Sequence, residues 1–168
     1  MVKILTIQID QSHQIKEPIV LRKASRAIIQ TKEGLIMICS KKYGEYKFPG
    51  GGVKDGEDLL HALTREVAEE TGYHELHDIQ EFGLVSEYKK ATDFAYTIFQ
   101  NDSYYFTCQV KGTPRNTKLD PYEQDYGYHV VVVSIEAAIK NNRLLFGNQR
   151  IPWVERDTAV LELLLGKT

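Results

Sequence analysis

Cysteine and long apolar runs are scarce in this sequence. The only two cysteines, Cys39 and Cys108, each lie in an apolar stretch, and their spacing fits neither a zinc site nor a disulfide framework. They are therefore expected to be buried, reduced thiols. No apolar stretch approaches the ~20 residues that span a bilayer, and the first residues meet charge too soon for a signal peptide. We expect a cytoplasmic protein without a membrane partner.

An excess of charge of one sign is also lacking. The 21 Lys and Arg residues nearly balance the 23 Asp and Glu residues, and the formal net charge is −2. Because affinity for a phosphate backbone comes mainly from clustered Lys and Arg, a nucleic-acid polymer is not an expected partner. A length of 168 residues without repeats or linkers predicts one domain over residues 1–168.

Strands and helices alternate in the predicted order of elements. Periodicity and turn residues predict strands near 3–9, 24–30, 35–40, 79–88, 95–100, 103–111 and 128–134. Helices are predicted at 58–71 and 135–141 and from Pro152 onward. The segment 10–17 is expected to be a loop, and Asn101-Asp102 a tight turn between two strands. This pattern predicts an α/β or α+β protein with helices layered on a mixed sheet.

A glycine-rich segment leads into an unusually acidic helix. Residues 41–56 contain too many glycines for a regular element, and the following helix bears Glu66, Glu69 and Glu70. These three acids occupy a sector of about 100° in the last turns, where neither their mutual repulsion nor the helix dipole favours them. Either they form a solvated acidic face with Arg65 as counterion, or they bind a hard cation such as Mg²⁺, which prefers carboxylate and water oxygens.

The spacing of these residues decides between the two interpretations. Gly51 precedes Glu57 by six residues, and Glu57 precedes Arg65 by eight, after which the three glutamates and Gly72 follow at fixed offsets. Residues 51–73 thus resemble the Nudix box of the Nudix hydrolase family (MutT-like proteins). The one departure is Tyr73, where the family usually has an aliphatic residue. The resemblance implies a Nudix-type α/β/α sandwich with a mixed β-sheet over about residues 20–145.

The resemblance also implies an activity and its cofactor. It assigns Glu66, Glu69 and Glu70, together with the carbonyl of Gly50, as ligands of Mg²⁺, or of Mn²⁺ in its place. The implied reaction is that of a pyrophosphohydrolase, in which water attacks a phosphoanhydride of a nucleoside triphosphate or a nucleoside diphosphate–X substrate. Arg65 would orient a catalytic glutamate, and Glu57 would brace the loop against the helix through a charge pair.

The acid that accepts the proton of the attacking water stays open at this point. Some family members use a glutamate of the box and others one from a later loop, where this sequence has Glu123 between Asp120 and Asp125. Glu123 is equally well explained as a solvated turn acid, and Glu87 is a weaker candidate.

The substrate-binding residues are predicted less sharply. Lys42 or Lys47 would hold a phosphate, and Tyr43, Tyr46 or Phe48 would stack on a base, although each also suits a plain loop or core position. Arg22 and Arg26 would border the pocket from the second strand. The only tryptophan, Trp153, covers the pocket, covers a dimer seam or caps the core, so a monomer and a homodimer are both open.

Several substrates and functions remain alternatives. ADP-ribose hydrolases usually carry a proline where this chain has Tyr88, and a tyrosine at this distance resembles dinucleoside polyphosphate hydrolases. We favour a nucleoside triphosphate. The rival functions are a non-catalytic nucleotide-sensing Nudix domain, an isomerase on the same scaffold and an acidic interaction module. The sequence keeps every charged residue of the box, which favours the enzyme.

Overall fold

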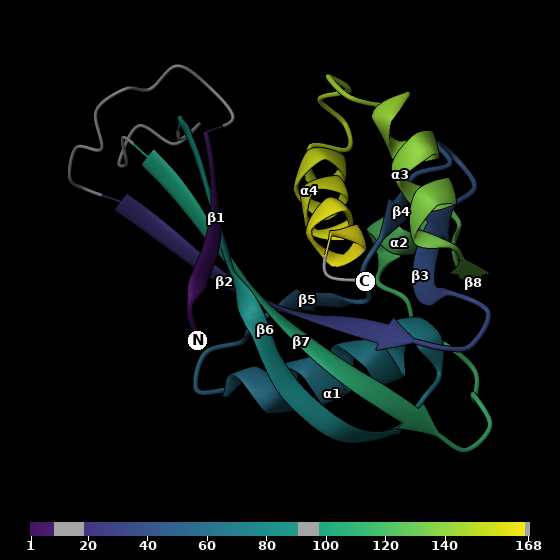
Figure 1. The fold of residues 1–168 in the computed structure, drawn as a ribbon. Coiled ribbons are helices and arrows are strands. Elements are labelled where there is room, and N and C mark those ends of the chain that lie inside the picture. Colours follow the sequence, from purple (N-terminus) through teal and green to yellow (C-terminus); the bar gives the residue numbers. More distant parts are fainter. Residues whose placement is uncertain (9–18, 91–97, 167–168) are drawn as a thin grey trace.

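The structure is a computed structural model that describes residues 1–8, 19–90 and 98–166 (Figure 1). The strands in this part of the chain are β1 (Lys3–Gln8), β2 (Ile19–Gln30), β3 (Leu35–Ser40), β4 (Tyr46–Lys47), β5 (Gly50–Gly52), β6 (Glu75–Lys90), β7 (Ile98–Lys111) and β8 (Tyr128–Val133). The helices are α1 (Leu59–Thr71), α2 (Pro121–Tyr126), α3 (Ile135–Arg143) and α4 (Trp153–Leu165). The predicted loop at 10–17 lies outside the described residues.

All the described strands join one mixed sheet. Its order is β1-β6-β7-β2-β3-β4, with β5 paired to β2 and β8 paired to β3. The long central strand β2 runs parallel to β7 and antiparallel to β3, where Ile29 lies opposite Ile36. The strands predicted at 24–30 and 35–40 are therefore confirmed, and they form an antiparallel hairpin.

Side-chain alternation along β2 builds two cores, one on each face of the sheet. Ala27 and Ile29 pack with Leu63 and Val67 of α1, whereas Ile28 points to the opposite face. There it joins a cluster that includes Ile139 of α3 and residues of α4. Figure 1 shows α1 on one side of the sheet and α3 and α4 on the other. The predicted α/β/α sandwich is confirmed.

Local signals fix both ends of α1. The Asp58 carboxylate accepts hydrogen bonds from the backbone N–H groups of Leu60 and His61, which caps the first turn. At the other end Gly72 adopts a left-handed φ of 79°, which glycine reaches without strain. Because the apolar stripe faces the sheet, the glutamates of the last two turns are directed along the side that borders the glycine segment.

The structure corrects three of the predicted elements. Residues 98–111 form one strand instead of two: Asn101 donates to Glu87 (2.6 Å) and Asp102 accepts from the Ser86 hydroxyl (2.6 Å), so both polar side chains are satisfied inside the sheet. The glycine-rich segment 41–56 contains two short strands, because backbone pairing there needs no side chains. Residues 121–126 form a helix whose signals, a capping Asp120 and a proline in the first turn, were overlooked.

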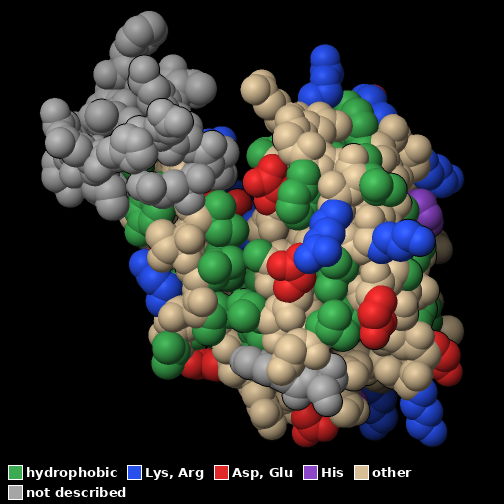
Figure 2. All heavy atoms as spheres, turned by 45° about the horizontal axis from the view of Figure 1, so that its top comes forward, with side chains coloured by type: hydrophobic (Ala, Val, Ile, Leu, Met, Phe, Trp, Pro, Cys, Tyr) green, Lys and Arg blue, Asp and Glu red, His purple; other side chains and the backbone are tan. Residues whose placement is uncertain are grey.

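The surface and the cysteines agree with the composition. Figure 2 shows Lys and Arg interspersed with Asp and Glu on the face in view, without a large area of one charge. In the described residues no helix is long and apolar enough to cross a membrane. Both cysteines are free thiols, but only Cys108 is buried as predicted, and Cys39 is half-buried. Burial raises the pKa of Cys108 to about 11, which keeps it protonated.

Candidate active site

The glycine segment lies against the acidic helix at a distance that only glycine permits. β5 pairs with β2, so that Gly50 lies opposite Arg26 and Gly51 opposite Ser25. A Cβ atom on Gly51 would lie 2.5 Å from the Glu66 carboxylate, and one on Gly50 would lie 2.2 Å from the Ser25 carbonyl oxygen. The backbone of the loop and the first acid of the helix are therefore in direct contact.

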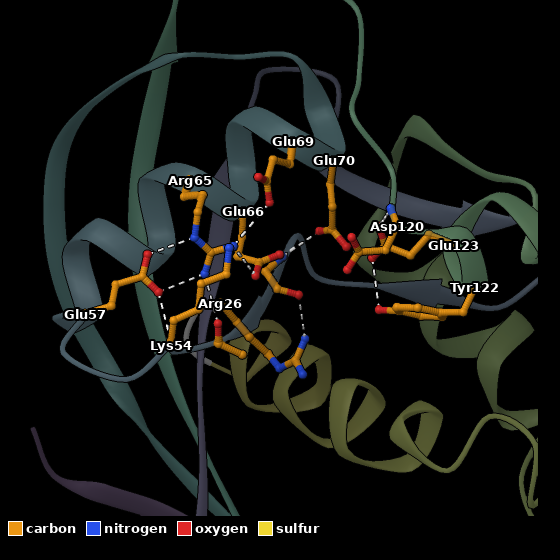
Figure 3. A network of polar contacts seen from close by, with 12 residues as sticks. Arg26, Lys54, Glu57, Arg65, Glu66, Glu69, Glu70, Asp120, Tyr122 and Glu123 are labelled. Atoms are coloured by element: carbon orange, nitrogen blue, oxygen red, sulfur yellow. Dashed lines mark hydrogen bonds and ion pairs between the residues drawn. The ribbon is translucent and has the colours of Figure 1, made fainter.

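Arg65 ties the loop to the helix (Figure 3). Its guanidinium donates two hydrogen bonds to Glu57 (2.8 Å each) and one to the Gly52 carbonyl (3.0 Å). It also donates to Glu66 (2.7 Å) and Glu69 (3.2 Å). The hydrogen bonds from Arg65 lower the pKa of Glu57 to about 2, so this ion pair persists at any physiological pH. The bracing and orienting roles expected of Glu57 and Arg65 match these contacts.

Glu70 is the most deeply buried of the three helix acids. Its side chain is 1% exposed and accepts hydrogen bonds from the Gly50 backbone N–H (2.7 Å) and from the Lys47 ammonium (2.6 Å). Burial, reinforced by the nearby Glu123 carboxylate, raises the pKa of Glu70 to about 7 although Lys47 acts in the opposite direction. Glu70 thus binds both the backbone of the glycine segment and the buried ammonium group of Lys47.

Glu123 reaches the same place from α2. It is 5% exposed and accepts hydrogen bonds from the Asp120 backbone N–H (2.9 Å) and the Tyr122 hydroxyl (3.0 Å). Lys47 Nζ lies 3.6 Å from its carboxylate. Burial acts to raise the pKa of Glu123, but the charge of Lys47 and the backbone hydrogen bond prevail and lower it. The structure therefore brings Glu123 beside the box acids, instead of leaving it as a solvated turn acid.

These side chains border two adjoining cavities. The first, which we call the acidic cavity, measures about 470 Å³ and is lined by Glu66, Glu69 and Glu123 together with Tyr122, Lys118 and Lys54. The second, the basic cavity, measures about 240 Å³ and is lined by Arg22, Arg26 and Lys47. The two share Arg22, Gly51 and Tyr122 in their walls. The carboxylates are thus confined to the first cavity, where they lie beside Lys54 and Lys118, whereas the charged residues that line the second are all cations.

The donor set of the acidic cavity fits a divalent cation. Burial first, and then the charges of Glu69 and Glu123, raise the pKa of Glu66, which shows that the negative charge there is incompletely compensated. Carboxylate and carbonyl oxygens are the ligands that Mg²⁺ prefers. In the described part of the chain no three acidic, His or Cys side chains already converge as a metal cage, because Arg65 and Lys47 hold the glutamates. A bound metal ion would replace Arg65 and Lys47 as the positively charged partner of these carboxylates.

Comparison with known proteins matches this geometry. The family model described as NUDIX domain matches residues 20–155. The chain belongs to the NUDIX family. A NUDIX hydrolase from Nitrosomonas europaea shares the fold with a TM-score of 0.54 at 20% identity, covering 83% of this chain and 88% of that one. A MutT protein from Bacillus halodurans gives a TM-score of 0.55 at 18% identity, covering 71% and 72%. A search of curated proteins found no match. The predicted Nudix-type pyrophosphohydrolase is thereby confirmed as the enzyme class.

The substrate residues predicted for this Nudix chain divide into two groups. Arg22, Arg26 and Lys47 line the basic cavity as expected. Phe48 does not fit the expectation: it is 0% exposed and packs edge-on against Tyr105 in the core, because its position in the chain points to the α4 face of the sheet. Tyr46 packs against the same core, with its backbone N–H and carbonyl both bonded to the Asn142 side chain. Neither aromatic ring is placed to stack on a base.

Lys42 lies elsewhere as well. Its ammonium pairs with Asp125 in an exposed ion pair and lies over the rings of Tyr43 and Tyr126. Sequence reasoning missed three residues of the basic cavity, Tyr122, Tyr128 and Arg156. A signal for Arg156 existed: together with Asp157 it puts charge between Val154 and Val160, on the apolar side of a helix, and charge at such a position calls for a buried partner or a ligand.

The raised pKa of Glu70 gives a testable pH dependence. Between pH 4.5, the ordinary pKa of the carboxyl, and about 7, the folded chain retains a proton that the unfolded chain has lost. The free energy of unfolding of the metal-free protein should therefore fall with rising pH in this window, by up to ~3 kcal/mol from this group. Glu70→Gln removes the titrating group. The free energy of unfolding of the wild type minus that of the variant, measured by urea unfolding with EDTA, should therefore decline from pH 5 to 7. A difference that stays constant or rises would contradict the assignment.

Proposed function

We propose that this Nudix enzyme hydrolyses a phosphoanhydride bond in a nucleoside triphosphate or a nucleoside diphosphate–X substrate and depends on Mg²⁺, or on Mn²⁺ in its place. The observation that supports this most directly is the junction at Gly51, where an acidic cavity meets a basic one. A polyphosphate chain needs cationic groups along its length and a site for hard cations at the bond that breaks. The two cavities together offer both within one continuous surface.

The helix acids are the proposed metal ligands. Glu66, Glu69 and Glu70, with the carbonyl of Gly50, would hold the cation. When bound, Mg²⁺ would neutralise phosphate charge and lower the pKa of a water molecule. At present the Gly50 carbonyl accepts a hydrogen bond from Arg26 (3.3 Å) and its N–H donates to Glu70 (2.7 Å), so the peptide that would supply the carbonyl ligand is already fixed from both sides.

The chain's own side chains would supply the remaining chemistry. Arg22, Arg26 and Lys47 would bind phosphate oxygens in the basic cavity, where the guanidinium groups can bind two oxygens at once. The acceptor for the proton of the attacking water is one of the glutamates that border the acidic cavity, Glu66 or Glu69 on α1 or Glu123 on α2. The Tyr122 hydroxyl holds the Glu123 carboxylate in place (3.0 Å).

A nucleotide panel with controlled metal tests this proposal. Release of phosphate or pyrophosphate is followed for nucleoside triphosphates, ADP-ribose, nucleotide sugars, dinucleoside polyphosphates and coenzyme A. We expect turnover of at least one substrate with Mg²⁺ or Mn²⁺, and a loss of ~10³-fold or more in EDTA, since metal ions contribute several kcal/mol to such transition states. Tight nucleotide binding without turnover would favour the sensor, and turnover that is insensitive to EDTA would reject the metal site.

A further inference from the structure

A third cavity extends the basic cavity away from the acids. It measures about 310 Å³ and is lined by Phe99 of β7, Pro152 at the start of α4, Glu87 and Lys89. Arg22, Trp153 and Arg156 lie in the walls of both cavities. We call this third space the aromatic cavity. Figure 3 shows α4 on the side of Arg26 that is remote from α1. A ligand with its phosphates near Gly51 would therefore direct its other end towards α4.

Arg156 is built into the core at the boundary of these cavities. It is 4% exposed, and its Nε donates to the Tyr105 hydroxyl (3.0 Å) and to Asp157 (2.9 Å). Its Nη1 donates to Glu87 (3.0 Å), which also accepts from Asn101 (2.6 Å). These bonds hold two of the three guanidinium nitrogens, Nε and Nη1, and so fix the plane of the group without a ligand.

The third nitrogen of this fixed guanidinium has no partner in the described part of the chain. Arg156 Nη2 is buried and finds no hydrogen-bond acceptor among the described residues, and the same holds for the indole N–H of Trp153. Both residues line the basic and the aromatic cavities. A buried donor without an acceptor is unfavourable, and a buried charged one more so. Two such donors on residues that line the same cavities therefore indicate a ligand that presents acceptor atoms to them.

The chemistry of the walls narrows the ligand to a base. The rings of Trp153 and of Phe99, which has the Lys89 ammonium 4.9 Å from its centroid, offer aromatic surface that suits a flat heterocycle at the end of a nucleotide remote from its phosphates. The unpaired N–H groups of Arg156 and Trp153 require a base with two acceptor atoms. A 6-oxopurine presents them as O6 and N7, the pattern that arginine reads in guanine, whereas a 6-aminopurine places a donor at that edge.

We propose that Arg156, with Trp153, determines base specificity and selects 6-oxopurine nucleotides over 6-aminopurine ones. This inference rests on the proposed function, because it assigns the far end of the same nucleotide site. A 6-aminopurine keeps only N7 as an acceptor at this edge and has an amino donor in place of O6, so one of the two protein donors would stay unpaired. Sites whose buried polar groups are left unpaired by the wrong substrate discriminate strongly.

The test compares substrates that differ at position 6 of the purine. We expect kcat/KM for inosine triphosphate to exceed that for adenosine triphosphate and for purine riboside triphosphate by ~10²-fold or more. Arg156→Lys keeps the charge beside Glu87 and Asp157 but removes Nη2, and should reduce this ratio at least ~10-fold. Arg143→Lys is the matched control, since Arg143 forms an exposed ion pair with Glu162 and should leave the ratio unchanged.

A second variant and a second readout separate a failure of this inference from a failure of folding or of the proposed function. Trp153→Phe retains an aromatic ring without the N–H donor, and decides the matter if Arg156→Lys does not fold. The chain contains one tryptophan, so quenching of its fluorescence reports on this cavity directly. Tighter quenching by inosine than by adenosine triphosphate supports the inference even if no turnover is found. Turnover with equal kcat/KM for inosine and purine riboside triphosphates would overturn it while leaving the proposed function intact.

Discussion

Glu66→Gln should lower kcat by at least ~10²-fold in saturating Mg²⁺, the range expected for loss of a general base or a metal ligand. The Glu66 carboxylate lies against the Gly51 backbone, lines the acidic cavity and is held by Arg65 at 2.7 Å. Glutamine keeps the shape and the hydrogen bond from Arg65 but removes the negative charge. The same change at Glu70 should have an effect of the same order, because its carboxylate is the buried partner of Gly50 and Lys47.

Folding and activity must be measured together for these variants. Circular dichroism and thermal unfolding should show that Glu66→Gln remains folded, since the lost charge is one of several that crowd the site. Glu136→Gln, an exposed glutamate in the first turn of α3, is the matched control and should leave kcat unchanged. Near-full turnover of a Glu66 or Glu70 variant in saturating Mg²⁺ would remove that residue from the proposed machinery.

Gly51→Ala should lower kcat by about 10- to 100-fold with little loss of stability. The new methyl group would lie 2.5 Å from the Glu66 carboxylate, so the carboxylate must move. Because the obstructed atoms are the end of a flexible side chain, the fold can absorb the change, whereas a catalytic group displaced by about 1 Å can lose ~10²-fold in rate. The measurement is kcat beside the melting temperature.

Gly52→Ala is the matched control at the next position. Its methyl group would lie 3.2 Å from the Arg22 guanidinium and would leave Glu66 in place. Because Arg22 is a proposed phosphate ligand, the change should act on KM, and kcat should change much less. The double variant Gly51→Ala/Glu66→Gln should be little worse than Glu66→Gln alone, since both changes act through one carboxylate. Fully multiplicative losses would show that Gly51 acts on something other than Glu66.

The box could be recognised from sequence because it is local. The helix over 59–71 with its Asp58 cap and Gly72 terminus, and the sector shared by its three acids, follow from spacing along one element. The hairpin of β2 and β3 likewise follows from two apolar runs around a turn. Prediction was less successful where polar residues lie inside a long strand, as at Asn101 and Asp102, since their hydrogen-bond partners come from β6.

Phe48 and Arg156 show the limit of sequence reasoning most clearly. Phe48 precedes the glycine segment and looked accessible, yet the alternation of the sheet turns it into the core against Tyr105. Arg156 lies 90 residues beyond Glu66. It reaches the site only because α4 packs on the sheet, where buried Glu87 and Asp157 hold its guanidinium.

The sequence by itself determined the chemistry of one helix and its loop: which acids are present, how they are spaced, and that glycine lies beside them. These properties depend on contacts between residues near each other in the chain. Only the tertiary structure decided that Glu123 and Lys47 meet Glu70, and that α4 places a partly unpaired arginine in the wall of the basic cavity. Such contacts depend on how two faces of a sheet are covered, and packing of distant segments leaves no periodic signature in the chain.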